Sequence, residues 1–383
     1  MHVPPLPRPT GGRFFEAYTR GLTTGDLERL FTRDAPEAYR FFSRNIDFNE
    51  LKDRPWHWRI LGQARLLFLA FTLKLTPARR ALYGASLVAC LVGLVELFQT
   101  VHLFLVPHPT FAPGTIWLLT GFLLVNLLML LEVADRLSLK NDLEIAREIQ
   151  QAMLPRGEYR APGIEAFGMT RPANTVGGDF YDILPLADGR LLLTLGDVAG
   201  KGSPAALLMA LLIAMLRTLV DEGLRGAELV ARLNVQIAKH APRSRFVTLF
   251  LAEFDPSTGA LVYVNAGQNP PLLRRRGGSY ERLRAGGMAL GMFEHATYSA
   301  GRVDLEPGDV LVMYSDGITE AEDPLEQPFD EAGVQFVTDS SEWASAKELG
   351  WATFAAVDAH RQDRKLLDDL TVLVARRLPP LPA

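Results

Sequence analysis

The chain has 383 residues, 48% of them hydrophobic, which is enough for a sizeable core together with a second module. Its formal net charge of -4 argues against a general nucleic-acid-binding protein, and its mean hydropathy of +0.08 is high for a wholly soluble protein, so membrane segments must be sought. The single cysteine, Cys90, excludes a disulfide within the chain and is typical of a reducing compartment.

Residues 1–55 are predicted to form a tail followed by a small helical cap. The first twelve residues are rich in proline and show neither the charged-then-apolar order nor the cleavage site of a signal peptide. Across residues 14–51, aromatic and charged residues recur at roughly helical spacing. A ligand-sensing domain would need a longer segment than this.

Residues 56–135 are predicted to be a membrane region with two transmembrane helices, at 81–106 and 115–134. Both apolar runs are long enough to cross a bilayer. The stretch before them, 56–75, is amphipathic and suits either the membrane surface or a core helix. A soluble helical domain with two buried helices is the alternative, and Glu96 and His102 favour it because ionisable groups are costly in a bilayer.

The charges around the two runs predict their orientation. Residues 107–114 contain no Lys or Arg, whereas Arg79, Arg80, Arg136 and Lys140 flank the outer ends. The positive-inside rule then places both termini in the cytoplasm, with a short external hairpin. We therefore expect a multi-pass membrane protein, with its larger C-terminal part in the cytoplasm.

Residues 136–155 are predicted to be a coiled-coil-like linker helix that ends at Pro155. Its apolar residues approximate a single stripe among charged positions, which suits a homodimer; a rigid spacer is the alternative. The stripe consists of Leu139, Leu143, Ala146, Ile149 and Met153.

The C-terminal region carries aspartates beside apolar runs. Asp197 follows the run 190–195 in LGDVAGKG, and Asp316 follows the run 310–314 in the triplet SDG. Asp179 lies in GGDFYD, with Asp182 three positions later, and Asp368 and Asp369 open DDLTVLVA. Hard divalent cations such as Mg2+ and Mn2+ prefer oxygen ligands, and aspartates at strand ends can surround them. The pattern therefore predicts a metal site.

The same region is predicted to be an α+β layered domain, spanning residues 156–378. The segment 205–219 is apolar nearly all round and too short for a membrane span, which indicates a core helix with Ser203 as its N-cap and Pro204 as its first residue. Short turns between the strands indicate mostly antiparallel pairing. Strands are expected at 190–195, 246–254, 260–265, 272–274, 298–303, 310–314 and 370–375.

An ordered set of motifs from about residue 144 to 377 resembles the stage-II-sporulation-E/RsbU-type serine phosphatases, which are bacterial relatives of the PP2C phosphatases. The motifs are GGDFYD, GDVAGKG with SPAALLMA, RFVTLFLAEFDPSTG, VNAGQNPPLL, LEPGDVLVMYSDGITEAED and DDLTVLV. The resemblance implies a β-sandwich flanked by helices. It also implies that the leader EIQQAMLP belongs to a helix that switches the enzyme on.

The resemblance implies a role for each aspartate around two Mn2+ or Mg2+ ions, which would hold and activate a water that hydrolyses the phosphoester without a protein nucleophile. Asp197 would bridge both ions with the backbone carbonyl of Val198, and Asp316 and Asp368 would bind one ion. Asp179 would bind an ion or its waters. Asp369 stands where PP2C relatives carry Asn and would support the metal site. Asp182 suits a turn cap at least as well as a ligand.

Three positions depart from the family pattern. Asn174 stands where eukaryotic PP2C enzymes carry a phosphate-binding Arg, five residues before Asp179, so the phosphate must be held by other residues. Gln268 replaces the His of the NAGHNP motif. The segment PLEQPFDEAGVQF follows the family only loosely, so substrate selection there cannot be transferred.

These observations predict a membrane-tethered, metal-dependent protein serine/threonine phosphatase, and the resemblance implies that its membrane is the bacterial inner membrane. The resemblance implies a phosphorylated STAS-type anti-sigma-factor antagonist as its substrate, and no nucleic-acid partner is expected. The alternative is a non-catalytic membrane scaffold that keeps the phosphatase fold for partner binding. The complete set of Asp ligands favours the enzyme.

Overall fold

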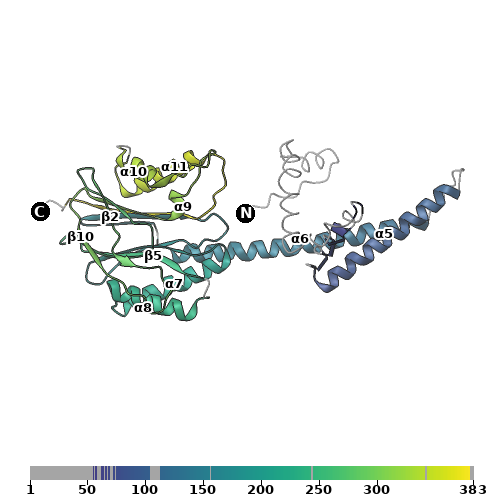
Figure 1. Cartoon of the computed structure of the whole chain (residues 1–383), viewed down its shortest axis with the longest axis horizontal. Coiled ribbons are helices and arrows are strands. Elements are labelled where there is room, and N and C mark those ends of the chain that lie inside the picture. The colour runs from purple at the N-terminus through teal and green to yellow at the C-terminus, as the bar shows by residue number, and fades with distance from the viewer. Residues whose placement is uncertain are drawn as a thin grey trace, which may run out of the picture. The chain divides into compact units, whose positions relative to one another are not determined.

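The structure is a computed structural model that describes residues 75–103, 113–155, 157–242, 245–340 and 343–379, with residues 55 and 57 and several positions between 62 and 73. The chain divides into two compact units, Met1–Arg136 and Leu137–Ala383, and each is described by itself (Figure 1). The predicted tail and helical cap lie outside the described residues, as does most of the amphipathic stretch 56–75.

In the first unit, α5 (Pro77–Leu103) and the beginning of α6 (Pro113–Met153) pack together as a pair. Glycine allows this close approach: a Cβ on Gly93 would lie 2.7 Å from the Leu118 side chain, and one on Gly121 would lie 2.4 Å from Cys90 Sγ. Such small residues are common where apolar helices meet inside membranes. An ion pair of 3.2 Å between Arg79 and Glu132 joins the outer ends of the pair.

Both helices are long and apolar enough to cross a membrane, over Pro77–Glu96 and Gly114–Glu132. Large apolar side chains are exposed along them, among them Leu91, Phe122 and Met129. The side chains of Gln99 and His102 lie outside the described residues. The second predicted span and the predicted linker are one continuous helix, because α6 runs unbroken to Met153.

The second unit is built on two sheets, which lie face to face with helices on both outer sides (Figure 1). The first sheet has the order β1-β2-β12-β11-β7-β8, and the second has the order β10-β6-β5-β4-β3, with β9 beside β6. The named strand pairings in the described chain are antiparallel apart from β6 with β9, as predicted from the short turns.

The strands of the first sheet are β1 (Glu158–Ala161), β2 (Ile164–Arg171), β12 (Leu370–Arg377), β11 (Val310–Tyr314), β7 (Leu272–Arg274) and β8 (Tyr280–Arg282). Those of the second sheet are β10 (Gly301–Asp304), β6 (Ala260–Ala266), β5 (Val247–Phe254), β4 (Leu191–Val198), β3 (Phe180–Pro185) and β9 (Gly286–Gly287). The helices of this unit after α6 are α7 (Ser203–Asp221), α8 (Gly226–His240), α9 (Asp316–Thr319), α10 (Asp330–Asp339) and α11 (Ala346–Arg361).

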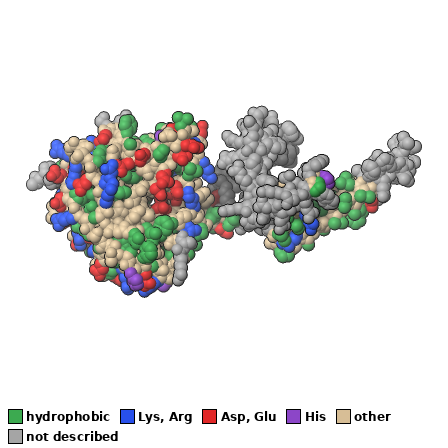
Figure 2. Space-filling view, in the orientation of Figure 1, with side chains coloured by type: hydrophobic (Ala, Val, Ile, Leu, Met, Phe, Trp, Pro, Cys, Tyr) green, Lys and Arg blue, Asp and Glu red, His purple; other side chains and the backbone are tan. Residues whose placement is uncertain are grey.

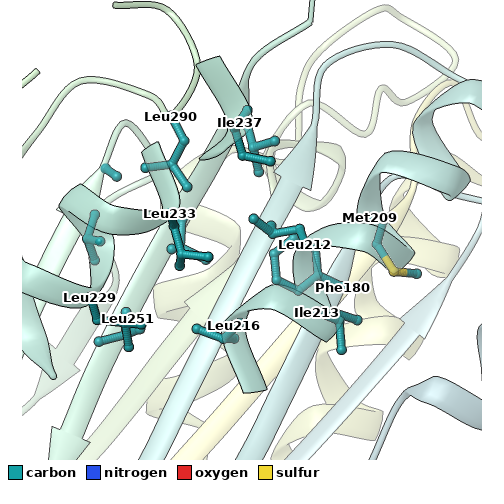
Figure 3. Packing of buried hydrophobic residues seen from close by; sticks show 14 of the residues in the cluster. Phe180, Met209, Leu212, Ile213, Leu216, Leu229, Leu233, Ile237, Leu251 and Leu290 are labelled. Carbon is teal, nitrogen blue, oxygen red and sulfur yellow. The ribbon is translucent and has the colours of Figure 1, made fainter. Parts of the chain in front are cut away.

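The central strands are apolar on both faces because each face meets a separate core. Along β4, Leu193 and Leu195 enter the core between the sheets, whereas Leu192 and Val198 pack against α7 and α8. Figure 3 shows the latter core, in which Leu212 and Leu233 from the two helices meet Leu251 of the second sheet. A third core joins the first sheet to α10 and α11. Successive strand residues point to opposite faces, so a continuous apolar run results.

Helix α7 is the core helix that the sequence predicts, although its length is not the reason. Its 19 residues are apolar enough to cross a membrane, which corrects the expectation that the segment is too short. One face nevertheless packs into the domain through side chains such as Met209, Leu212 and Leu216. The helix begins at Ser203 with Gly202 as its N-cap, one residue earlier than predicted.

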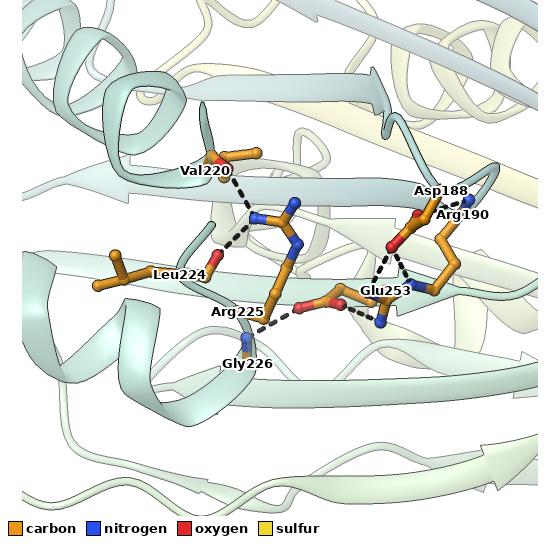
Figure 4. A network of polar contacts seen from close by, with 7 residues as sticks. All are labelled: Asp188, Arg190, Val220, Leu224, Arg225, Gly226 and Glu253. Carbon is orange, nitrogen blue, oxygen red and sulfur yellow. Dashed lines mark hydrogen bonds and ion pairs between the residues drawn. The ribbon is translucent and has the colours of Figure 1, made fainter. Parts of the chain in front are cut away.

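A polar network ties the turn between α7 and α8 to the second sheet (Figure 4). Glu253, which is 5% exposed, accepts hydrogen bonds from Gly226 N at 2.8 Å and from the guanidinium of Arg190 at 3.0 Å. Arg225 donates to the carbonyl oxygens of Val220 and Leu224, both at 2.7 Å. These bonds tie the turn that follows α7 to the beginning of α8 and to β5.

Candidate metal centre

Strand pairing in the second sheet brings Asp179 beside Asp197. In the register of β3 and β4, Phe180 lies opposite Gly196. Antiparallel continuation by one residue therefore places Asp179, just before β3, next to Asp197 near the end of β4. The pair stands where the LGDVAGKG loop leaves the sheet, as the sequence predicts.

Strand pairing in the first sheet assembles the other two aspartates at the ends of β11 and β12. Ser315 N donates to Thr371 O at 3.0 Å, and Thr371 N donates to Ser315 Oγ at 3.0 Å. Asp316 follows Ser315 directly, and Asp368 comes two residues before β12 begins. The two carboxylates are close enough that Asp368 is a cause of the raised pKa of Asp316.

Asp369 joins the two sheets at this end of the domain. Its carboxylate accepts hydrogen bonds from Gly178 N at 2.7 Å and from Ala173 N at 2.8 Å. A Cβ on Gly177 would lie 2.3 Å from Asp369 Oδ2, so the contact requires glycine there. Asp369 thus holds the loop that carries Asp179 against β12, which fits its expected supporting position.

The aspartate cluster formed by Asp179, Asp197, Asp316 and Asp368 is crowded and partly buried. Burial raises the pKa of Asp179 well above its ordinary value, and the charge of Asp197 raises it further. Burial and then the charge of Asp316 raise the pKa of Asp197 to about 7. Burial and Asp368 likewise raise the pKa of Asp316. Several carboxylates that destabilise one another in this way are a favourable setting for a cation.

Two further observations fit a divalent metal. Asp179 is 4% exposed, and its Oδ2 atom has no hydrogen-bond partner among the described residues, a costly state unless a ligand binds it. A Cβ on Gly178 would lie 2.8 Å from Val198 O and 3.1 Å from Asp197 Oδ1, so the absent side chain leaves both oxygens approachable. Carboxylate and carbonyl oxygens suit Mg2+ and Mn2+.

The four aspartates of the cluster lie near one another, but their carboxylates do not surround a common metal position among the described residues. In the part of the chain that the structure describes, no three His, Cys, Asp or Glu side chains surround a single point. One reason is visible: the Asp368 Oδ2 atom lies 2.8 Å from Lys201 Nζ. A cation bound through Asp368 Oδ2 would therefore compete with the Lys201 ammonium for this oxygen.

The other singled-out residues have structural positions. Asp182 is fully buried and forms an ion pair of 2.8 Å with Arg217 of α7, so it caps no turn. Gln268 is 7% exposed and donates to Tyr314 O at 3.5 Å, where it supports the end of β11. Asn174 is exposed. These partners could not be predicted from the sequence, since each contact joins distant segments.

The last turn of α6 reaches the loop that carries Asp179. The side-chain amide of Gln150 donates to Gly177 O at 2.7 Å and accepts from Gly177 N at 3.2 Å. A small cavity of about 230 Å3 lies between this turn and the domain, and Asp179 and Tyr181 are among its lining residues. Sequence reasoning identified the helix but not this amide pair.

Comparison with known proteins identifies relatives over the second unit. The family model of stage II sporulation protein E (SpoIIE) matches residues 187–378. The chain is 30% identical over 232 residues to protein IcfG of Synechocystis, and this match covers 54% of the chain and 36% of IcfG. It is 28% identical over 243 residues to the phosphoserine phosphatase RsbU of Bacillus subtilis, covering 62% and 71%.

A solved structure shares the fold. The SiaA-PP2C domain of Pseudomonas aeruginosa superposes with a TM-score of 0.56 at 22% identity, and the match covers 64% of the chain and 99% of that domain. The predicted α+β sandwich flanked by helices is confirmed. The chain spans about a third of the length of IcfG, so the match covers one region of that relative.

Proposed function

The chain belongs to the SpoIIE family, as its motifs predicted, and from this premise we propose that it is a metal-dependent protein serine/threonine phosphatase. One observation carries the proposal. Four aspartates from distant segments gather at one end of the sandwich, and the most buried of them, Asp179, has one carboxylate oxygen with no hydrogen-bond partner among the described residues.

The residues have distinct expected roles. Asp197, with the carbonyl of Val198, would hold two ions, and Asp316 and Asp368 of the other sheet would hold one of them. Asp369 is engaged with backbone amides and therefore orients the loop of Asp179. Mn2+ or Mg2+, when bound, would supply an activated water and neutralise the charge on the phosphoryl oxygens.

The substrate that we propose is a phosphoserine or phosphothreonine on a STAS-type anti-sigma-factor antagonist. The matched relative RsbU is named a phosphoserine phosphatase, and the match covers 71% of its length. Phosphoprotein substrates also suit the open surface of the site, because both Lys201 and Asp368 are partly exposed.

We also propose that α5 and the first part of α6 are the two transmembrane helices of a multi-pass inner-membrane protein, with the second unit in the cytoplasm. The apolar, exposed side chains of these helices support this placement. A homodimer through the end of α6 is proposed because Leu139 and Ile149 of the predicted stripe are 62% and 59% exposed.

The decisive assay uses the full-length chain in detergent and a serine-phosphorylated STAS domain, with and without Mn2+. We expect metal-dependent release of phosphate, reduced about 10²-fold or more in Asp316→Asn because a metal ligand is lost. Asp339→Asn is the matched control, since Asp339 is an ion-paired carboxylate outside the site. A chain that binds no Mn2+ would instead support the non-catalytic scaffold.

A further inference from the structure

A cavity of about 460 Å3 opens beside the aspartate cluster, and the proposed reaction does not yet use it. Gly317, Asp368 and Lys201 line it on the side of the cluster, and Arg361, Arg364 and Lys365 line it elsewhere. Figure 2 shows acidic side chains gathered on the surface close to where Figure 1 places α9, with Lys and Arg side chains nearby. The cavity is therefore a route to the metal site that combines both signs of charge.

The side chains of the two cavity arginines, Arg361 and Arg364, are already bonded to acceptors within the protein. Arg364 donates to Glu322 at 2.9 Å and to Asp323 O at 2.7 Å. Arg361 pairs with Asp358 at 2.9 Å and donates to Arg364 O. Because each guanidinium already has fixed acceptors, neither is poised to bind an incoming anion.

Lys201 differs from these arginines because its only carboxylate partner among the described residues belongs to the aspartate cluster. Its ammonium lies 2.8 Å from Asp368 Oδ2 and also donates to Leu367 O. Gly200 and Gly202 on either side have positive φ angles of 106° and 74°, so the turn that carries Lys201 depends on glycine. Half of the Lys201 side chain is exposed, so it can move.

We propose that Lys201 binds the phosphoryl group of the substrate. In eukaryotic PP2C enzymes this task belongs to an arginine at the position that Asn174 occupies in this chain. The inference rests on the proposed phosphatase function. Without metal, Asp368 holds the Lys201 ammonium. Once Asp368 ligates a divalent cation, repulsion between two cations displaces Lys201 into the cavity, where a phosphate oxygen becomes its partner.

This exchange makes Lys201 a competitor of the metal and a partner of the phosphate. Removing its charge must therefore have opposite effects on the two ligands. A residue that only supports the loop would weaken both, because a distorted loop harms metal and phosphate binding together.

The first experiment measures Mn2+ binding to the full-length chain in detergent by isothermal titration calorimetry. In Lys201→Met we expect the Kd for Mn2+ to fall about 3- to 10-fold, because Asp368 no longer has to give up an ion pair. The matched control is Lys347→Met. Lys347 is 52% exposed and pairs with Glu158 at 2.9 Å, but it lies outside the cavity lining.

The second experiment titrates inorganic phosphate into the Mn2+-loaded chain. In Lys201→Met we expect the Kd for phosphate to rise about 10- to 100-fold, as for the loss of one charge-assisted hydrogen bond. Lys201→Arg keeps a cation of similar reach and should stay within about 3-fold of the wild type. Lys347→Met should leave phosphate binding unchanged.

The outcomes separate this inference from the function on which it rests. Weaker Mn2+ binding in Lys201→Met, or unchanged phosphate binding in that variant, overturns the role of Lys201 while the phosphatase proposal stands. A wild-type chain that takes up no Mn2+ overturns both. Tighter Mn2+ binding together with weaker phosphate binding, restored by arginine, supports the proposal.

Discussion

Replacing Asp197 with asparagine in the metal-free protein should stabilise it at pH 8. The pKa of Asp197 rises from its ordinary value of 3.8 to about 7 on folding, chiefly through burial and secondly through Asp316. At pH 8 the carboxylate is ionised in both the folded and the unfolded chain, so the folded state carries the cost of that charge. Asn has nearly the same shape and carries no charge, which removes the cost.

The size of the effect follows from the pKa difference. About three pKa units correspond to at most about 4 kcal/mol, and partial exposure of the site reduces the expectation to about 2 kcal/mol. For a unit of this size, that change corresponds to a rise in Tm of roughly 4–8 °C. The advantage of asparagine should shrink as the pH falls through 7 toward 4, because the folded wild type then becomes protonated and neutral.

The assay is thermal unfolding of the full-length chain in detergent with EDTA, at pH 8 and pH 5, for wild type, Asp197→Asn and the control Asp339→Asn. Adding Mn2+ should reverse the order, since only the wild type gains about 2.7 kcal/mol at 100 times its Kd. The reasoning is refuted if Asp197→Asn is less stable than the wild type at pH 8 in EDTA. An advantage that is equal at both pH values would refute it as well.

Three further expectations test other parts of the structure. Arg217→Met should lower the free energy of unfolding by about 2–4 kcal/mol in denaturant titrations, because Asp182 stays buried without its partner, and adding Asp182→Asn should recover at least half of the loss. Gly317→Ala should weaken Mn2+ binding at least about 10-fold in calorimetry, since its Cβ would lie 2.1 Å from the carbonyl oxygen of Asp369, whereas Gly277→Ala meets no atom within 4 Å and should bind normally. The affinity for Mn2+ should fall by up to about 10-fold per pH unit below pH 7, because a proton on Asp197 then competes with the metal; a flat profile between pH 5 and 7 would contradict this.

Much of the fold could be predicted because its strands and helices have strong local signals. The strands at 272–274 and 310–314 match their predicted limits, and the Asp255 to Gly259 turn joins β5 and β6 as expected. Strand β2 was missed because the buried Glu165 and the central Gly168 interrupt its apolar pattern. Glu165 is buried because Ala346 N donates to it at 3.0 Å, a contact across 181 residues.

In the candidate site, too, features that depend on neighbouring residues could be predicted, whereas contacts between distant segments could not. Each aspartate could be named from the glycine and strand residues next to it, since metal ligands recur at strand ends. The bonds that decide what each carboxylate does join segments far apart, such as Asp368 to Lys201 and Asp182 to Arg217. Only the folded chain reveals that one aspartate is salt-bridged deep in the core and another is restrained by an ammonium.

The paired amide bonds between Gln150 and Gly177 make the final turn of α6 a part of the loop that presents Asp179. Both bonds use one planar side chain, so a small rotation of the helix about its axis breaks them together. A movement of this turn that broke one bond would therefore release Gly177, two residues before Asp179, from both. The loop that carries Asp179 is thus held by a side chain that lies outside the aspartate cluster.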